Sequence, residues 1–255
     1  DGSDRKFSGR IGSEANPGAV ETYIQRRQSS ERGSACCGAL QRRPEITETE
    51  SKNGGNKDKM KQIWKPGNMI YPVPAVLVTV PTPDGKGNIL TIAWTGTICT
   101  NPAMTYISVR PERYSYPLLR ESGEFVINLT NEKLVRAADY CGVRSGRDVD
   151  KFAECHLTRE TAEHVSAPMI AESPVNIECR VREVHEYGSH HMFAADVLAV
   201  HADEQYMDEN GRFVLGLANL ITYSHGEYYS LGKKLGTFGY SIKKKKAKEK
   251  ARDNV

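Results

Sequence analysis

The sequence predicts a mainly β domain, a β-barrel with a few helices, over residues 60–240. Three observations predict it. Short segments rich in Val, Ile, Thr and aromatic residues recur along this part of the chain. Clusters of Gly, Pro, Asn and Asp separate them, as expected of turns. Only two segments have helical periodicity, so strands and helices do not alternate as they would in a wound parallel sheet.

The domain is expected to begin with strands joined by a tight turn. Residues 75–80 are rich in β-branched side chains and end at the Pro-Thr-Pro-Asp-Gly cluster of residues 81–85. The β pattern resumes at residues 88–92, and residues 104–109 alternate cleanly between apolar and polar side chains. These features predict three strands in the first third of the domain.

Helices are expected in the middle of the domain. Residues 115–121 predict a short helix, and residues 124–129 predict another strand. Residues 131–140 place their apolar side chains on one face, which predicts a second helix. Thr130 or Asn131 is a suitable N-terminal cap for it. Both helices therefore interrupt a series of strands.

The remaining segments are expected to be strands again. A polar segment, residues 142–150, follows the second helix. The β pattern then predicts strands over residues 175–184, 192–203 and 221–223. The chain thus contains enough short strands to close a barrel.

The two ends of the chain differ in composition from the domain. Residues 1–59 contain many charged, Gly, Ser and Asn residues and few large apolar ones, so they cannot bury enough surface to offset ordering. We expect a disordered or non-native leader there, with Met60 as the natural start. Residues 241–255 carry a run of Lys, and we expect a basic disordered tail.

Composition excludes several classes of protein. The net charge is +3, with 35 basic and 32 acidic side chains among 255 residues. This balance argues against general nucleic-acid binding, which needs a concentrated basic excess. The longest apolar run, residues 73–80, is too short to span a bilayer. Since no secretory signal is recognisable either, we expect a cytoplasmic protein without a membrane partner.

The cysteines and short motifs argue against metal sites and nucleophilic catalysis. None of the six cysteines forms a Cys-x-x-Cys pair, so we expect free thiols and no metal. Phosphate-loop, dinucleotide-binding and nucleophile-elbow motifs are missing. Cys155 precedes His156, but neighbours on a strand point to opposite faces, which argues against a catalytic thiol. We therefore expect no catalytic side chain in the strict sense.

Four segments combine aromatic, cationic and small polar residues at expected strand ends and loops. They are residues 91–102, 110–116, 141–152 and 188–192. Each has an ordinary alternative: a core tryptophan, surface arginines, a surface loop or solvated histidines. Together they offer a flat wall for a heteroaromatic ring and a cationic helix N-terminus for a phosphate. FMN is a ligand with both features.

Residues 60–240 resemble the flavin reductase-like FMN-binding split barrels, and within them the flavoredoxin group. Several blocks carry the resemblance in the right order. They are residues 88–96, 108–117, 121–129, 141–152, 173–180, 188–190 and 231–236. The resemblance implies a Greek-key split barrel that binds FMN noncovalently near a homodimer interface. The leader has no counterpart in the family.

The resemblance also implies roles for individual residues. Asn88 and Trp94 would lie beside the flavin, and Ser115 with Arg113 would hold the phosphate. Lys151 and His190 would approach the cofactor, and either, when cationic, would stabilise negative charge on the reduced form. The full set of expected FMN-binding residues is Asn88, Trp94, Thr95, Gly96, Thr97, Arg110, Arg113, Tyr114, Ser115, Lys151, His190 and Tyr223.

Two functions follow from the resemblance. The first is an NAD(P)H-dependent flavin reductase, in which the cofactor carries the chemistry and the protein orients the rings. The alternative is an electron carrier of the flavoredoxin type, whose FMN exchanges electrons with redox partner proteins. The basic tail would help to dock an acidic partner. No ribose-recognition motif favours NADH over NADPH.

Overall fold

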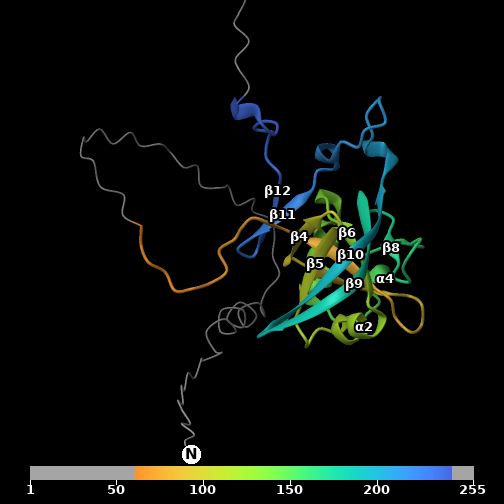
Figure 1. Ribbon diagram of the computed structural model, residues 1–255. Coiled ribbons are helices and arrows are strands. Elements are labelled where there is room, and N and C mark those ends of the chain that lie inside the picture. Colours follow the sequence, from red (N-terminus) through yellow and green to blue (C-terminus); the bar gives the residue numbers. More distant parts are fainter. Residues whose placement is uncertain (1–60, 243–255) are drawn as a thin grey trace, which may run out of the picture. The chain divides into compact units, whose positions relative to one another are not determined.

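The computed structural model describes residues 61–242, and those from Lys65 onward belong to one compact unit. The expectations for residues 1–59 and for residues 243–255 lie outside the described residues. A seven-stranded antiparallel sheet dominates this unit (Figure 1). Its strands, in spatial order, are β3 (Asn88–Ile92), β2 (Val76–Val80), β6 (Glu124–Leu129), β9 (Val175–Tyr187), β10 (His190–Ala202), β5 (Ala103–Val109) and β4 (Thr95–Thr100).

The connection between the two end strands shows that this sheet curls into a barrel. Laid flat, its first and last strands would be about 29 Å apart, because neighbouring strands are spaced by roughly 4.8 Å. Yet β3 ends at Ile92 and β4 begins at Thr95, and that stretch of chain reaches at most about 11 Å. The sheet must therefore bend back on itself. Within the described residues β3 and β4 do not pair with each other, so the barrel stays open along this seam.

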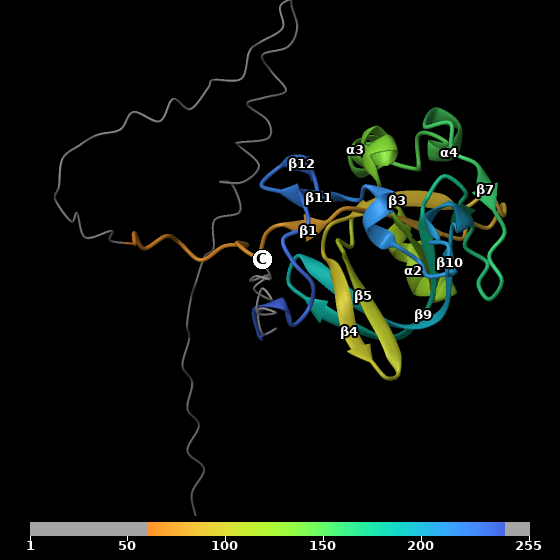
Figure 2. The same cartoon turned by 90° about the horizontal axis from the view of Figure 1, so that it is seen from above.

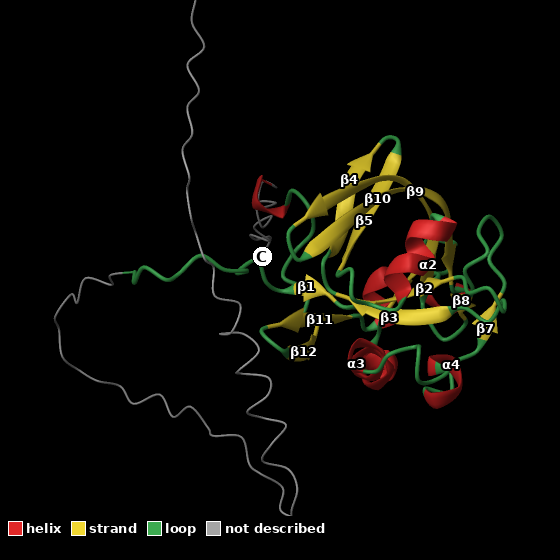
Figure 3. Cartoon of the chain, turned by 90° about the horizontal axis from the view of Figure 1, so that it is seen from below, coloured by secondary structure: helices red, strands yellow, loops and turns green. Residues whose placement is uncertain are grey.

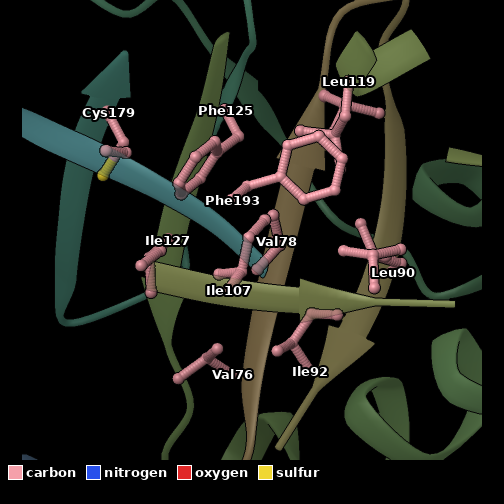
Figure 4. Packing of buried hydrophobic residues seen from close by; sticks show 13 residues of the cluster. Val76, Val78, Leu90, Ile92, Ile107, Leu119, Phe125, Ile127, Cys179 and Phe193 are labelled. Atoms are coloured by element: carbon pink, nitrogen blue, oxygen red, sulfur yellow. The ribbon is translucent and has the colours of Figure 1, made fainter. Parts of the chain in front are cut away.

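The inside of the barrel holds the main hydrophobic core (Figure 4). Alternation along β2 sends Val76, Val78 and Val80 inward, where they meet side chains from the opposite part of the curled sheet. Among those, Phe125 and Phe193 are fully buried. In a strand with one face in solvent, buried and exposed residues would alternate, but every residue of β2 is buried. A second layer must therefore cover its other face.

Two short helices supply that layer. The helices α3 (Val135–Val143) and α4 (Lys151–Glu154) lie outside β2 and β3 (Figure 3). Leu77 and Ile89 point outward from those strands into a second apolar cluster with Ala138 and Phe152. The 3-10 helix η1 (Glu132–Leu134) leads into α3, and Asn131 caps it by accepting from the amides of Lys133 and Leu134. The predicted cap is thus confirmed.

The helix α2 (Ser115–Ser122) lies within the curve of the sheet (Figure 3). Leu119, which is 1% exposed, packs into the barrel core. Gly123 ends the helix in the left-handed region, at φ 65°, which a residue with a Cβ adopts only with strain. Its first residue, Ser115, is hydrogen-bonded to Asn88 of β3, so the N-terminus of the helix lies beside the seam.

Two smaller sheets and four short 3-10 helices complete the described unit (Figure 2). The strands are β1 (Val73–Pro74), β11 (Ile221–Ser224) and β12 (Glu227–Ser230) in one sheet, and β7 (Arg159–Glu160) and β8 (Met169–Ile170) in the other. The other 3-10 helices are η2 (Glu204–Tyr206), η3 (Leu215–Ala218) and η4 (Tyr240–Ile242). No helix among the described residues has the length and apolar character needed to cross a membrane.

The predicted mainly β barrel is confirmed, with three local corrections. Residues 95–100 were expected to be a loop after a strand but form the edge strand β4. His190 and His191 were expected in a turn but begin β10, and the turn is Gly188–Ser189. Cys155 is not on a strand: α4 ends at this residue, and His156 follows with φ 53°.

Candidate functional site

A cavity of about 270 Å³ opens beside the seam of the barrel. Three stretches of chain line it: the end of β3 with the link to β4, the segment from the end of β5 to the start of α2, and the segment from α3 to α4. His190, at the start of β10, adds a fourth side. The curled sheet thus brings together parts of all four segments that the sequence singled out.

The start of α2 is fixed to β3 by a buried hydrogen bond. Asn88 Nδ2 donates to Ser115 Oγ at 2.7 Å, and the two residues are 6% and 1% exposed. Gly146 packs against the same amide so closely that a Cβ there would come within 1.9 Å of Asn88 Oδ1. Only glycine leaves room for this contact. Ser115 therefore faces the cavity from a fixed position.

The cavity has a cationic lining. Arg110, Arg113, Arg144 and Lys151 line it, against one carboxylate from the described residues, that of Glu112. The Arg113 guanidinium donates from Nη1 to the carbonyl oxygen of Gly142 at 3.0 Å, which ties the α2 side of the cavity to the α3 side. Within residues 61–242, no side chain caps the N-terminus of α2. The local field therefore favours an anionic group.

Lys151 is the most buried of these cations, with 5% of its surface exposed. Its Nζ donates to the carbonyl oxygens of Ile89 at 2.7 Å and Cys141 at 2.8 Å. In the described part of the chain it forms no ion pair with a carboxylate. Burial, with a contribution from nearby Arg113, lowers the pKa of Lys151 to about 8. A bound anion would supply the missing opposite charge.

His190 differs from Lys151 in its protonation. Burial lowers the pKa of His190, and the nearby positive charges of Arg110 and Arg113 lower it further. The lowered pKa favours the neutral imidazole, so Lys151 is the stronger candidate of the two for the expected cation. Its Nδ1 is 2.9 Å from Ser189 Oγ. His190 can donate or accept a hydrogen bond at the cavity, whereas Lys151 supplies charge.

Trp94 forms the aromatic wall of the cavity. It lies in the two-residue link between β3 and β4, and its carbonyl oxygen accepts from the Ser108 amide at 2.9 Å. On the other side, the Tyr71 ring lies 6.1 Å from the Trp94 ring, centroid to centroid. The backbone of Trp94 is thus fixed to β5, and its indole packs against the Tyr71 ring. A planar heteroaromatic ring could stack against such a wall.

Two further hollows adjoin the cavity at opposite ends. One, of about 450 Å³, shares Tyr114, Gly146 and Lys151 with it and contains Asn88. The other, of about 490 Å³, shares Trp94 and His190. The aromatic wall and the buried cation thus lie toward different ends of one elongated groove. Such a groove suits a long ligand with a ring at one end and an anionic group at the other.

Most of the predicted binding residues meet at this groove. The cavity itself is lined by Trp94, Arg110, Arg113, Tyr114, Ser115, Lys151 and His190. Asn88 and Thr95 line the adjoining hollows. Gly96 and Thr97 line none of these three hollows; they lie further along β4, opposite Tyr106 and Thr105 of β5. Tyr223 contacts Tyr71 at a centroid distance of 6.4 Å and is thus one ring removed from Trp94.

The predicted set of binding residues omits several of the lining residues. Ser108, Gly142, Arg144 and Gly146 all line the cavity. Arg144 and the two glycines belong to a segment already recognised as cationic and glycine-containing. Ser108 could have been found from the alternation along β5, which places a small polar side chain next to the core residues Ile107 and Val109. The close approach of Gly146 to Asn88 has no counterpart in the sequence pattern.

Comparisons with known proteins identify the family of this chain. The family described as the flavin reductase like domain matches residues 68–232. An uncharacterized protein of Aeropyrum pernix is 34% identical over 139 residues, which are 54% of this chain and 52% of that protein. The chain therefore spans about half the length of that relative. An uncharacterized protein of Pyrococcus abyssi is 27% identical over 66% of this chain and 95% of its own.

Solved structures share the fold. Flavoredoxin of Desulfovibrio vulgaris (Miyazaki F) is 31% identical, with a TM-score of 0.67 over 72% of this chain and all of that chain. Flavoredoxin from Methanosarcina acetivorans is 27% identical, with a TM-score of 0.65 over the same shares. A split barrel domain from Shewanella frigidimarina has a TM-score of 0.60 at 21% identity, over 66% of this chain and 86% of that one. The last supports the fold alone.

Proposed function

The chain belongs to the flavin reductase like domain family, and from this premise we propose that it binds FMN and accepts electrons from NAD(P)H. One observation carries the proposal: Trp94, Ser115, Lys151 and His190, from distant parts of the sequence, line a single cavity with a cationic interior. An aromatic wall and an anion site in one groove match a phosphorylated ring system. The flavin-binding character of the family supports the same ligand.

The residues present fit FMN. Ser115 Oγ, the uncapped start of α2 and the Arg113 guanidinium would hold the phosphate. Trp94 would lie against the isoalloxazine, and Thr95 with Asn88 would form the ends of the groove. Bound FMN would supply the redox chemistry, because its ring can accept two electrons as a hydride from a nicotinamide. The lining side chains would set where the ring lies and how much water reaches it.

Lys151 and His190 would have separate tasks. Lys151, held between two carbonyl groups and charged at neutral pH, would favour negative charge on the bound ligand. Neutral His190 would hydrogen-bond at the cavity without adding charge. Neither residue needs to form a covalent bond. The protein's contribution is thus to orient the ring and tune its potential.

Anaerobic reduction tests the proposed donor. The full chain, loaded with FMN and freed of excess, is mixed with NADH or NADPH while flavin absorbance is followed. We expect the visible absorbance of the flavin to bleach with at least one of the two donors, because a reductase accepts electrons directly. Stopped-flow or manual mixing can follow this loss of absorbance. Bound flavin that dithionite reduces but neither nicotinamide bleaches would exclude the reductase.

A second function is favoured by the flavoredoxin structures, which align over their whole length at 31% and 27% identity. In this alternative the bound FMN exchanges electrons with partner proteins and not with NAD(P)H. A reduced iron–sulfur protein would then bleach the flavin under the conditions in which NADH and NADPH do not. The same absorbance measurement therefore separates the two functions.

We propose further that the protein is a homodimer with FMN near the interface. Ile98 on β4, Tyr187 on β9 and Val200 on β10 are 45%, 60% and 59% exposed, and these are large apolar side chains on strands of one sheet. Exposed apolar surface of this kind is typical of protein contacts. Analytical ultracentrifugation of the full chain measures the assembly, and a mass of one chain at micromolar concentration would contradict it.

A further inference from the structure

Two cysteines from different helices meet beside the cavity. Cys141, near the end of α3, is 1% exposed, and Cys155, at which α4 ends, is half-buried. Their sulfur atoms lie 3.9 Å apart. The packing of both helices on the outer face of β2 and β3 brings them together. Neither sulfur takes part in the flavin chemistry proposed for the cavity.

The segment between these cysteines forms one wall of the cavity. Gly142, Arg144, Ser145, Gly146 and Lys151 all lie between them in sequence and line the cavity. The wall is joined to its surroundings through Arg113 to the Gly142 carbonyl, through Lys151, through the packing of Gly146 against Asn88 and through the Asp150–Arg159 ion pair. A covalent bond between the cysteines would tie its two ends together.

We propose that Cys141 and Cys155 form a reversible disulfide that restrains this wall of the cofactor cavity. The sulfur atoms need to approach from 3.9 Å to about 2.05 Å, a movement that rotation of the two side chains can provide. Because Cys99 belongs to β4 and Cys179 to β9, the disulfide is specific to this pair among the described cysteines.

The oxidant is a hydroperoxide, and the electrons balance in two steps. The Cys155 sulfur attacks the peroxide O–O bond, which gives a sulfenic acid at Cys155 and one molecule of water. The Cys141 thiol then attacks that sulfur: the S–S bond forms, the S–O bond breaks and a second water leaves. The two thiols lose two electrons and two protons, and hydrogen peroxide is reduced to two waters. A small dithiol reverses the bond by exchange.

The surroundings of the two sulfurs determine which of them reacts first with the peroxide. Cys155 is the more accessible to solvent, so it meets the peroxide first. Burial raises the pKa of both thiols, that of Cys141 to about 12. The reaction is therefore slow compared with that of thiols tuned for catalysis. Cys141, buried and already in contact, captures the sulfenic acid before a second peroxide arrives.

The disulfide has a consequence for the cofactor, which rests on the proposed function. With both ends joined, the wall has less freedom to swing away from the cavity. The Cys141 carbonyl also holds Lys151, so the anion site is restrained with it. Oxidised protein should thus release FMN more slowly than reduced protein. The bond itself does not depend on FMN.

The first experiment detects the bond without reference to the cofactor. The full chain is treated with hydrogen peroxide, its remaining thiols are alkylated, and its peptides are mapped by mass spectrometry. We expect a Cys141–Cys155 crosslinked peptide, lighter than the two thiol peptides by two hydrogen atoms and lost after dithiothreitol. Cys99→Ser should leave it unchanged, whereas Cys155→Ser should abolish it. Alkylation of both thiols after treatment, or sulfinic acid at Cys155, would overturn the proposal.

The second experiment measures FMN release from oxidised and reduced protein after dilution into excess apoprotein acceptor. Release should slow by roughly tenfold on oxidation, because the restrained wall is preorganised. Cys155→Ser should give the same rate with and without peroxide. A crosslink with an unchanged release rate would contradict the restraint of the wall. A chain that crosslinks but never binds FMN would contradict the proposed function instead and leave the disulfide established.

Discussion

At the scale of single residues, Lys151 supplies positive charge to the cavity, whereas His190 supplies a hydrogen-bonding group. Among the described residues, Lys151 is buried between two carbonyl oxygens without a carboxylate partner, and burial lowers its pKa to about 8. His190, at the same cavity, has a lowered pKa and is neutral. Two groups that the sequence presents as interchangeable cations therefore act differently. The difference arises from their surroundings, which the sequence does not display.

Replacement of Lys151 tests its role as the buried cation. In Lys151→Ala we expect FMN affinity to fall by roughly 10-fold to 100-fold, as estimated for the loss of a charged hydrogen-bonding partner. Loss of the bonds to the Ile89 and Cys141 carbonyls should also lower unfolding stability by about 1–3 kcal/mol. Titration with FMN followed by fluorescence measures the affinity. Lys133→Ala, at an exposed position of η1, is the control, and equal affinities for the two variants would contradict the role.

The lowered pKa of Lys151 predicts a pH dependence of binding. A bound anion favours the protonated amine, so it raises this pKa above the value of about 8 in the free protein. Affinity for FMN is consequently highest below pH 8 and falls as pH rises through and beyond that value. Dissociation constants between pH 7 and 9, where the phosphate charge is nearly constant, measure the effect. The fall in FMN affinity above pH 8 should be absent in Lys151→Ala. An FMN affinity that does not change with pH in the unaltered protein would exclude a contribution from Lys151.

At the scale of elements, the site depends on contacts between segments that pack from different sides of β3. The Asn88–Ser115 hydrogen bond joins β3 to α2, and Gly146 brings the α3–α4 segment against the same amide. The sequence predicted β3, α2 and most of α3, because each has a clear local pattern, but it did not predict the four-residue helix α4. It missed β4, since Gly96 and the lack of alternation between apolar and polar residues weaken the strand pattern of residues 95–100, which form a strand by pairing with β5. Long-range pairing of this kind leaves little trace in a local pattern.

A single added methyl group tests the contact between these elements. In Gly146→Ala the new Cβ would lie 1.9 Å from Asn88 Oδ1, so the segment or the Asn88–Ser115 pair must shift. We expect FMN affinity to fall by about tenfold or more, because overpacking costs ~1–3 kcal/mol. Gly216→Ala, in η3, where a Cβ meets no described atom within 4 Å, is the matched control. Normal binding by the Gly146 variant would show that the contact does not hold the site in shape.

At the scale of the whole molecule, the closing of the barrel creates the site. The two-residue link between β3 and β4 forces the sheet to curl, and the same link carries Trp94 to the seam. The recurring β segments and the turn clusters between them predicted the barrel. They could not predict which loops would meet, because loop positions depend on strand order. The family resemblance supplied that information for Trp94, Ser115, Lys151 and His190, whereas Gly96 and Thr97 do not line the groove.

The barrel core tests this architecture through stability. Phe125 is fully buried at the centre of the barrel, and Phe125→Ala should lower the free energy of unfolding by about 3–5 kcal/mol. In a domain of this size that loss lowers the melting temperature by roughly 6–20 °C. Phe238→Ala removes the same kind of side chain from an exposed position and should change the melting temperature little. Equal melting temperatures for the two variants would contradict this packing.

The proposed function requires that distant segments converge to bind FMN, and Trp94 allows this convergence to be measured. The chain has two tryptophans, so Trp64→Phe leaves the Trp94 emission alone. Titration of this full-length variant with FMN should quench the emission in a saturable curve that ends at one FMN per chain. Emission that FMN leaves unchanged, together with free passage of FMN in equilibrium dialysis, would show that these segments do not form an FMN site.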